Sequence, residues 1–147
     1  MTEQGPKKLR KLQLREDTSR PTRILYVEDA EVIRDTISRL LEVYGYKVAS
    51  AKNGQEGVEM ALKWKPDLVL MDLRMPIMDG YNAIYDIRFN SQTRHIPIFV
   101  VSAWSGKKER DQARLVGADK FFVKPPNFNQ LMEAITSAVA VSPQKSP

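Results

Sequence analysis

Short apolar runs alternate with amphipathic segments along most of the chain. The runs are typical of buried strands in a parallel sheet, and they cover residues 24–27, 68–71, 98–101 and 121–123; residues 47–51 are predicted as a further short strand. Segments of helical periodicity follow them, over residues 31–44, from 54 to a stop at Pro66, and over 79–89, 107–116 and 128–139. Because parallel strands need a crossover helix, this alternation predicts an α/β fold: a doubly wound five-stranded parallel sheet with five helices.

The apolar positions of the first and last helical segments predict which side of each helix is buried. In the first, the stripe expected to face inward is Val32, Ile33, Ile37, Leu40, Leu41 and Tyr44. Gly45 follows, where a glycine that ends a helix is expected. In the last, Leu131, Ile135 and Val139 are expected to face inward.

Hydrophilic residues follow four of the five predicted strands. Glu28 and Asp29 follow the first, Asp72 the third, Ser102 the fourth and Lys124 the fifth. In open α/β sheets, ligands bind outside the carboxyl ends of the strands. The sequence therefore predicts that these residues share one pocket.

Composition limits the chemistry of that pocket and the number of domains. The 147 residues suit one domain, and the absence of cysteine with a single histidine, His95, excludes disulfides, thiolate sites and multi-histidine metal centres. The net charge of +5 is concentrated in residues 1–22, which hold six bases against three acids. We expect a flexible basic tail over 1–22, a folded domain over 23–140 and a disordered end over 141–147.

No apolar run approaches the ~18 residues of a membrane span, and no signal peptide opens the chain. We therefore expect a cytoplasmic protein without a membrane partner. Nucleic acid binding by the basic tail is the weaker interpretation of its charge, and deleting the tail would test it through any salt-dependent binding.

Three carboxylates at neighbouring strand ends repel one another, by up to about 4 kcal/mol per contact at ~4 Å, so a cation must offset them. Mg²⁺ fits best, because its ligands are hard oxygens and the chain has no soft ligand to offer there. Lys124 adds a second positive charge, and Ser102 adds a hydroxyl donor. Such a set suits a phosphoryl group, and it indicates phosphoryl transfer onto a carboxylate.

The motifs at these strand ends resemble those of response-regulator receiver domains, the phosphorylatable part of two-component signalling systems. They are ILYVED, LVLMDLRMPIMDG, VVSA and GADKFFVKP, within about residues 23 to 139. The resemblance implies a flavodoxin-like fold with strand order 2-1-3-4-5. It also implies a single-domain signalling protein rather than an enzyme, one that catalyses only its own Mg²⁺-dependent phosphorylation and slow dephosphorylation.

The resemblance assigns a role to each candidate residue. Asp72 would accept the phosphoryl group, while Asp29, Asp72 and the Arg74 backbone carbonyl would bind Mg²⁺, and Glu28 would bind it through water. Lys124 would contact the phosphoryl oxygens, and a cis peptide bond between Lys124 and Pro125 would aim it into the pocket. Ser102 and Phe121 would form the switch that changes the surface of the fourth helix, fifth strand and fifth helix.

The implied partners are a histidine kinase or histidine phosphotransfer protein and an unidentified downstream protein, and a phosphorylation-dependent homodimer is left open. His95, in a predicted surface loop, is not expected to relay phosphoryl groups. Two alternatives also remain: a Mg²⁺-dependent phosphatase or phosphotransferase, and a receiver that binds partners without phosphate. Arg74 and Trp104 stand two residues beyond Asp72 and Ser102, and neither is suited to orienting water, which predicts slow self-dephosphorylation.

Overall fold

The computed structural model describes residues 20–141. Residues 1–19 of the predicted tail and 142–147 of the predicted end lie outside this range. Within it, five strands alternate with five helices: β1 (Arg23–Val27), α2 (Glu31–Val43), β2 (Lys47–Ala51), α3 (Gly54–Trp64), β3 (Leu68–Met71), α4 (Gly80–Phe89), β4 (Ile98–Ser102), α5 (Lys107–Val116), β5 (Lys120–Val123) and α6 (Phe128–Val141). The strands form one parallel sheet in the order β2-β1-β3-β4-β5, which confirms the predicted fold.

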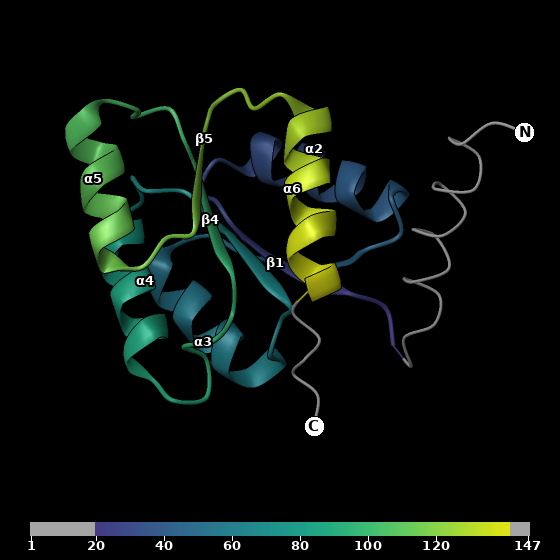
Figure 1. Ribbon diagram of the computed structural model, residues 1–147, viewed down its shortest axis with the longest axis horizontal. Helices are drawn as coiled ribbons and strands as arrows, with labels where there is room; N and C mark the ends of the chain where they lie inside the picture. The colour runs from purple at the N-terminus through teal and green to yellow at the C-terminus, as the bar shows by residue number, and fades with distance from the viewer. Residues whose placement is uncertain (1–19, 142–147) are drawn as a thin grey trace, which may run out of the picture.

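Two apolar cores lie on opposite faces of the sheet (Figure 1). Helices α3, α4 and α5 cover one face, and α2 and α6 cover the other. The central strands β1, β3 and β4 are buried almost throughout, which explains why they are apolar without alternation. Each fully buried aliphatic side chain contributes about 1.5–3 kcal/mol, so these strands hold the framework on which the strand ends are placed.

Local side-chain and backbone features set the helix boundaries. The Asn53 side chain accepts a hydrogen bond from the Glu56 N–H at 2.8 Å and caps α3. Asp79 caps α4 in the same way through Asn82 N–H at 2.9 Å, so this helix begins at Gly80 and not at the predicted residue 79. Gly45 follows α2 with φ 96°, a left-handed conformation that glycine adopts without strain.

The predicted burial of the α2 stripe is wrong for most of its members. Leu41 is buried and Ile37 packs partly against the core. The exposed members are Val32 (77%), Ile33 (40%), Leu40 (39%) and Tyr44 (41%). An apolar stripe is buried only where another element covers it, and an open groove separates the first half of α2 from the start of α6. The α6 prediction is better, since Leu131 and Ile135 are buried and Val139 packs against the same core.

The amino-terminal end of β1 is tied to the loop before β3. The Arg20 guanidinium contacts both carboxylate oxygens of Asp67 at 3.1 Å, and the Arg23 N–H donates to Asp67 at 2.8 Å. The described chain is therefore held in place from Arg20, at the end of the sheet opposite the carboxyl ends of the strands. Among the described residues, no helix has both the length and the apolar character needed to cross a membrane.

Candidate functional site

The carboxyl ends of β1 and β3 bring three carboxylates together. In the sheet register, Val27 pairs with Met71, so the residues that follow them, Glu28 and Asp72, lie on neighbouring strand ends. One oxygen from each of Glu28, Asp29 and Asp72 lies within 4.8 Å of the others. Glu28 and Asp72 are buried, whereas Asp29 is exposed at the mouth.

Lys124 reaches this cluster from the end of β5, almost a hundred residues further along the chain. Its Nζ atom lies 2.5 Å from Glu28 Oε1 and 3.3 Å from Asp72 Oδ2. The Lys124–Pro125 peptide bond is cis. The ammonium group thus bridges the two buried carboxylates.

Burial and charge perturb both partners of this bridge. Burial, followed by the negative charge of Glu28, raises the pKa of Asp72 from 3.8 to about 6, against the opposing effects of Lys124 and the Leu73 N–H. Burial by itself would lower the pKa of Lys124, but the hydrogen bond to Glu28 and the charge of Asp72 outweigh it and raise that pKa. A carboxyl whose ionisation is disfavoured in this way will gain from an additional cation.

Glu28 is held by contacts that sequence reasoning missed. The Tyr26 hydroxyl donates to Glu28 Oε1 at 3.3 Å, and the Ala30 N–H donates to Oε2 at 3.1 Å. Arg34 of α2 donates to the Glu28 backbone carbonyl at 2.8 Å. The sequence did contain a signal for the contact of Tyr26 with Glu28. Tyr26 stands two residues before Glu28, and residues at that spacing in a strand point to the same face of the sheet.

The loop after β3 fits closely around Asp72. Asp72 Oδ1 accepts a hydrogen bond from the Leu73 N–H at 2.8 Å, and the Gly80 N–H donates to the Leu73 carbonyl at 2.9 Å. A Cβ atom at Gly80 would lie 2.1 Å from the Asp72 carbonyl oxygen, so only glycine fits there. Ile77, in the same loop, is exposed and has φ 68°, a strained conformation for a β-branched residue.

Ser102 and the residues beyond it form the opposite side of the site. Ser102 is buried, and its Oγ accepts a hydrogen bond from the Trp104 N–H at 3.1 Å, which leaves its own proton to be donated. The Arg74 guanidinium lies over the Trp104 ring, 3.9 Å from its centroid. Phe121 is half-buried, and the Arg110 guanidinium lies 5.2 Å from its ring centroid.

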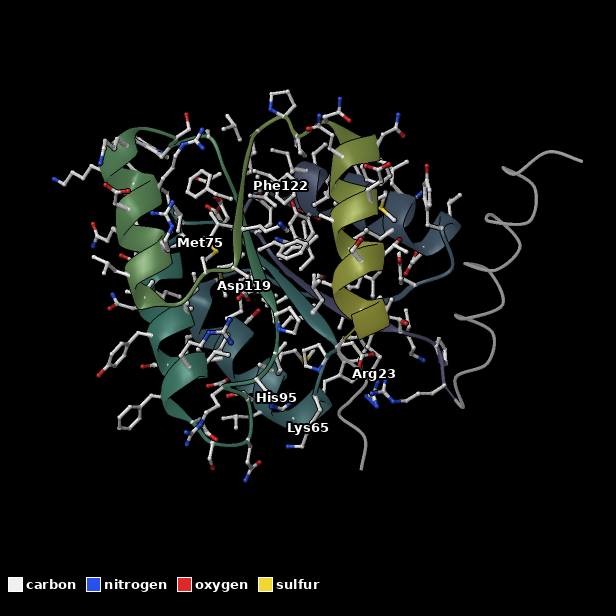
Figure 2. All side chains as sticks on the ribbon, in the orientation of Figure 1. Arg23, Lys65, Met75, His95, Asp119 and Phe122 are labelled. Carbon is white, nitrogen blue, oxygen red and sulfur yellow. The ribbon has the colours of Figure 1, made fainter. Side chains whose placement is uncertain are left out.

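The donor set suits a hard divalent cation. Three carboxylates with one ammonium leave an excess of negative charge, and every available ligand is an oxygen. His95 takes no part: it is exposed and precedes β4, and Figure 2 shows it toward the end of the sheet from which the strands start.

Comparison with known proteins adds to this geometry. A family model described as the response regulator receiver domain matches residues 24–136. The chain belongs to the response regulator receiver family. It is therefore a receiver domain of the kind found in two-component signalling.

Individual receiver proteins show how far the similarity extends. The transcriptional regulatory protein PdtaR of Mycobacterium tuberculosis is 40% identical over 125 residues, covering 84% of this chain but only 60% of PdtaR. The polar-differentiation response regulator DivK of Brucella anthropi is 30% identical over 117 residues, covering 80% of this chain and 95% of DivK. The chain thus spans less than two thirds of PdtaR and nearly all of DivK.

A solved receiver structure matches the fold closely. It is the receiver domain of the sensor histidine kinase PA1611 from Pseudomonas aeruginosa PAO1, with a TM-score of 0.75, 30% identity, and coverage of 80% of this chain and 97% of that one. That structure has a magnesium ion coordinated in its active-site cleft.

Proposed function

We propose that this receiver accepts a phosphoryl group on Asp72 from a histidine kinase or histidine phosphotransfer protein, in a Mg²⁺-dependent reaction, and so controls the binding of a downstream partner. The observation that carries the proposal is the Lys124 ammonium placed between the Glu28 and Asp72 carboxylates, with Asp29 beside them. Those charges suit a group that is itself negative and needs cations around it.

The transfer step uses Asp72 as the nucleophile. One Asp72 carboxylate oxygen attacks the phosphorus of a phosphohistidine, the new P–O bond forms as the P–N bond breaks, and the electron pair of that bond returns to the imidazole nitrogen. Lys124 Nζ, now 3.3 Å from Asp72 Oδ2, is close enough to contact the incoming phosphoryl oxygens. Bound Mg²⁺ would neutralise charge on those oxygens, held by Asp29, Asp72 and the Arg74 carbonyl, with Glu28 acting through water.

The proposed switch follows from competition for Lys124. In the unphosphorylated protein its ammonium is shared between Glu28 and Asp72. A phosphoryl group on Asp72 carries more negative charge than the carboxylate, so it should draw Lys124 and the free proton of the Ser102 hydroxyl toward it. Ser102 ends β4, and Phe121 lies on β5, so the change would reach the surface formed by α5, β5 and α6.

The stacked Arg74 and Trp104 side chains support a long-lived phosphoryl group. Their 3.9 Å stack joins the loop after β3 to the loop after β4, and neither side chain supplies a carboxylate or amide to orient an attacking water. We therefore infer slow self-dephosphorylation. A phosphoryl half-life of only seconds in the isolated protein would contradict this inference.

The test is incubation with Mg²⁺ and acetyl phosphate, followed by intact mass measurement. The wild type should gain one phosphoryl group, the gain should vanish with EDTA, and Asp72→Asn should gain none. Asp86→Asn is the matched control, because it makes the same change on α4, outside the acidic cluster. A phosphoryl adduct that persists in Asp72→Asn would contradict the proposal, as would no adduct from either acetyl phosphate or a phosphorylated histidine kinase. Steady release of phosphate from small phosphate esters would favour the phosphatase alternative. The cytoplasmic location stays a prediction.

A further inference from the structure

An open apolar groove lies between α2 and the connection from β5 to α6, on the face of the sheet opposite α3, α4 and α5. Its volume is about 380 Å³, within the range of ligand-binding clefts. Tyr26, Leu70 and Val101 of the three central strands lie at its base. Pro125 and Pro126 line the side nearest the phosphorylation site.

The α2 wall of this groove is apolar and uncovered, but acidic at its rim. Val32 and Ile33 line the groove while 77% and 40% exposed, respectively. The neighbouring acids Asp29, Glu31 and Asp35 are exposed as well. A surface of this kind fits a segment that carries both apolar side chains and positive charge.

The chain contains one such segment, outside the described residues. Residues 7–15 read KKLRKLQLR, with five bases, three leucines and no acid. The six residues 142–147, SPQKSP, have no leucine, isoleucine or valine to offer as an alternative occupant. Composition and charge therefore select residues 7–15.

The segment is also within reach of the groove. Arg20 is held against Asp67 just before β1, and Leu14 stands six positions earlier in the chain, which allows about 20 Å of extended chain. From Arg20 to Tyr26 at the groove base the chain also advances by six residues, which spans at most about 20 Å. The length between Arg20 and the leucines is sufficient.

We propose that residues 7–15 dock in this groove, with leucine side chains on its apolar base and basic side chains toward Asp29, Glu31 and Asp35. The groove and the phosphorylation site share two residues. Tyr26 and Lys124 line the groove, and both bind the Glu28 carboxylate. Docking and phosphorylation should therefore influence each other, a consequence that rests on the proposed function, whereas docking itself does not.

The absence of cysteine allows a direct test in the full chain. Gln13→Cys carries a nitroxide label between Leu12 and Leu14, and the label broadens the amide NMR signals of nearby residues in ¹⁵N-labelled protein. We expect selective broadening over the first turns of α2 and the start of α6. Adding Val32→Gln should reduce the ratio of docked to free segment by about tenfold or more, because a buried apolar contact is lost.

Val43→Gln is the matched control. Val43 lies on the same helix, is 79% exposed and does not line the groove, so its substitution should leave the broadening unchanged. Replacing Leu9 and Leu12 by serine should abolish the broadening without touching the folded domain. Adding Asp72→Asn should leave the broadening in place, which separates failure of docking from failure of the proposed phosphorylation.

Three results would overturn the proposal. The first is the absence of selective broadening. The second is broadening that salt removes but Val32→Gln does not, which would show a purely electrostatic contact. The third is broadening of ¹⁵N chains that carry no nitroxide, in a mixed sample with nitroxide-labelled ¹⁴N chains. That result would make a second copy of the protein the occupant of the groove.

Discussion

Replacing Asp72 by asparagine should make the protein more stable at neutral pH in the absence of divalent cations. The side chain is 7% exposed and its pKa is raised to about 6 by burial and by the charge of Glu28. The difference between the ordinary value of 3.8 and about 6 corresponds to roughly 3 kcal/mol of unfolding free energy that ionisation removes. Asparagine keeps an oxygen for the Leu73 N–H without carrying that charge.

The sign of the pH dependence follows from the direction of the shift. A carboxyl whose pKa is higher in the folded protein favours folding when protonated, so its penalty begins above about pH 4 and is complete above about pH 6. The variant should therefore match the wild type near pH 4 and exceed it by about 2–3 kcal/mol at about pH 7.5.

Urea denaturation followed by circular dichroism, in EDTA, measures this difference. With a slope of about 1–3 kcal/mol per M, the midpoint should rise by roughly 0.7–3 M at about pH 7.5. Asp86→Asn changes the net charge equally and should give no comparable rise. Mg²⁺ should stabilise the wild type more than Asp72→Asn. Equal stability of wild type and Asp72→Asn at neutral pH, or a difference that does not change with pH, would refute the reasoning.

Three further substitutions test other parts of the site. Lys124→Ala should cost about 2–4 kcal/mol at neutral pH, because it leaves two buried carboxylates uncompensated, and the cost should shrink as acid protonates them. Lys120→Ala, at the exposed start of β5, should cost little in the same urea titrations. Gly80→Ala should lower the midpoint of thermal unfolding strongly, because its Cβ would lie 2.1 Å from a backbone oxygen. Gly106→Ala should be tolerated, because its Cβ would meet only a flexible side chain. Equal unfolding midpoints for the two variants would contradict this prediction. Burial and the nearby carboxylates raise the pKa of Tyr26, so alkaline titration of tyrosine absorbance should show a late component that Tyr26→Phe removes. A titration curve that Tyr26→Phe leaves unchanged would count against the buried placement of its hydroxyl.

Much of the framework could be predicted from the sequence, because strand and helix formation leave local periodic patterns. The apolar runs of β1, β3 and β4 require burial on both faces, which only a parallel sheet between helices provides. Acids placed directly after two such runs must meet, since neighbouring parallel strands end at the same edge. The strand order itself rested on family resemblance.

What the sequence by itself determined is therefore the alternation of elements and the edge of the sheet where the charged residues gather. Only the tertiary structure decided which atoms touch: the bridge from Lys124 to Glu28, the Tyr26 hydroxyl on the same carboxylate, and the stack of Arg74 on Trp104. It also left the α2 stripe largely uncovered, where periodicity predicted burial. The physical reason is that periodicity records which side of an element is apolar, whereas coverage and contact depend on where distant elements come to rest.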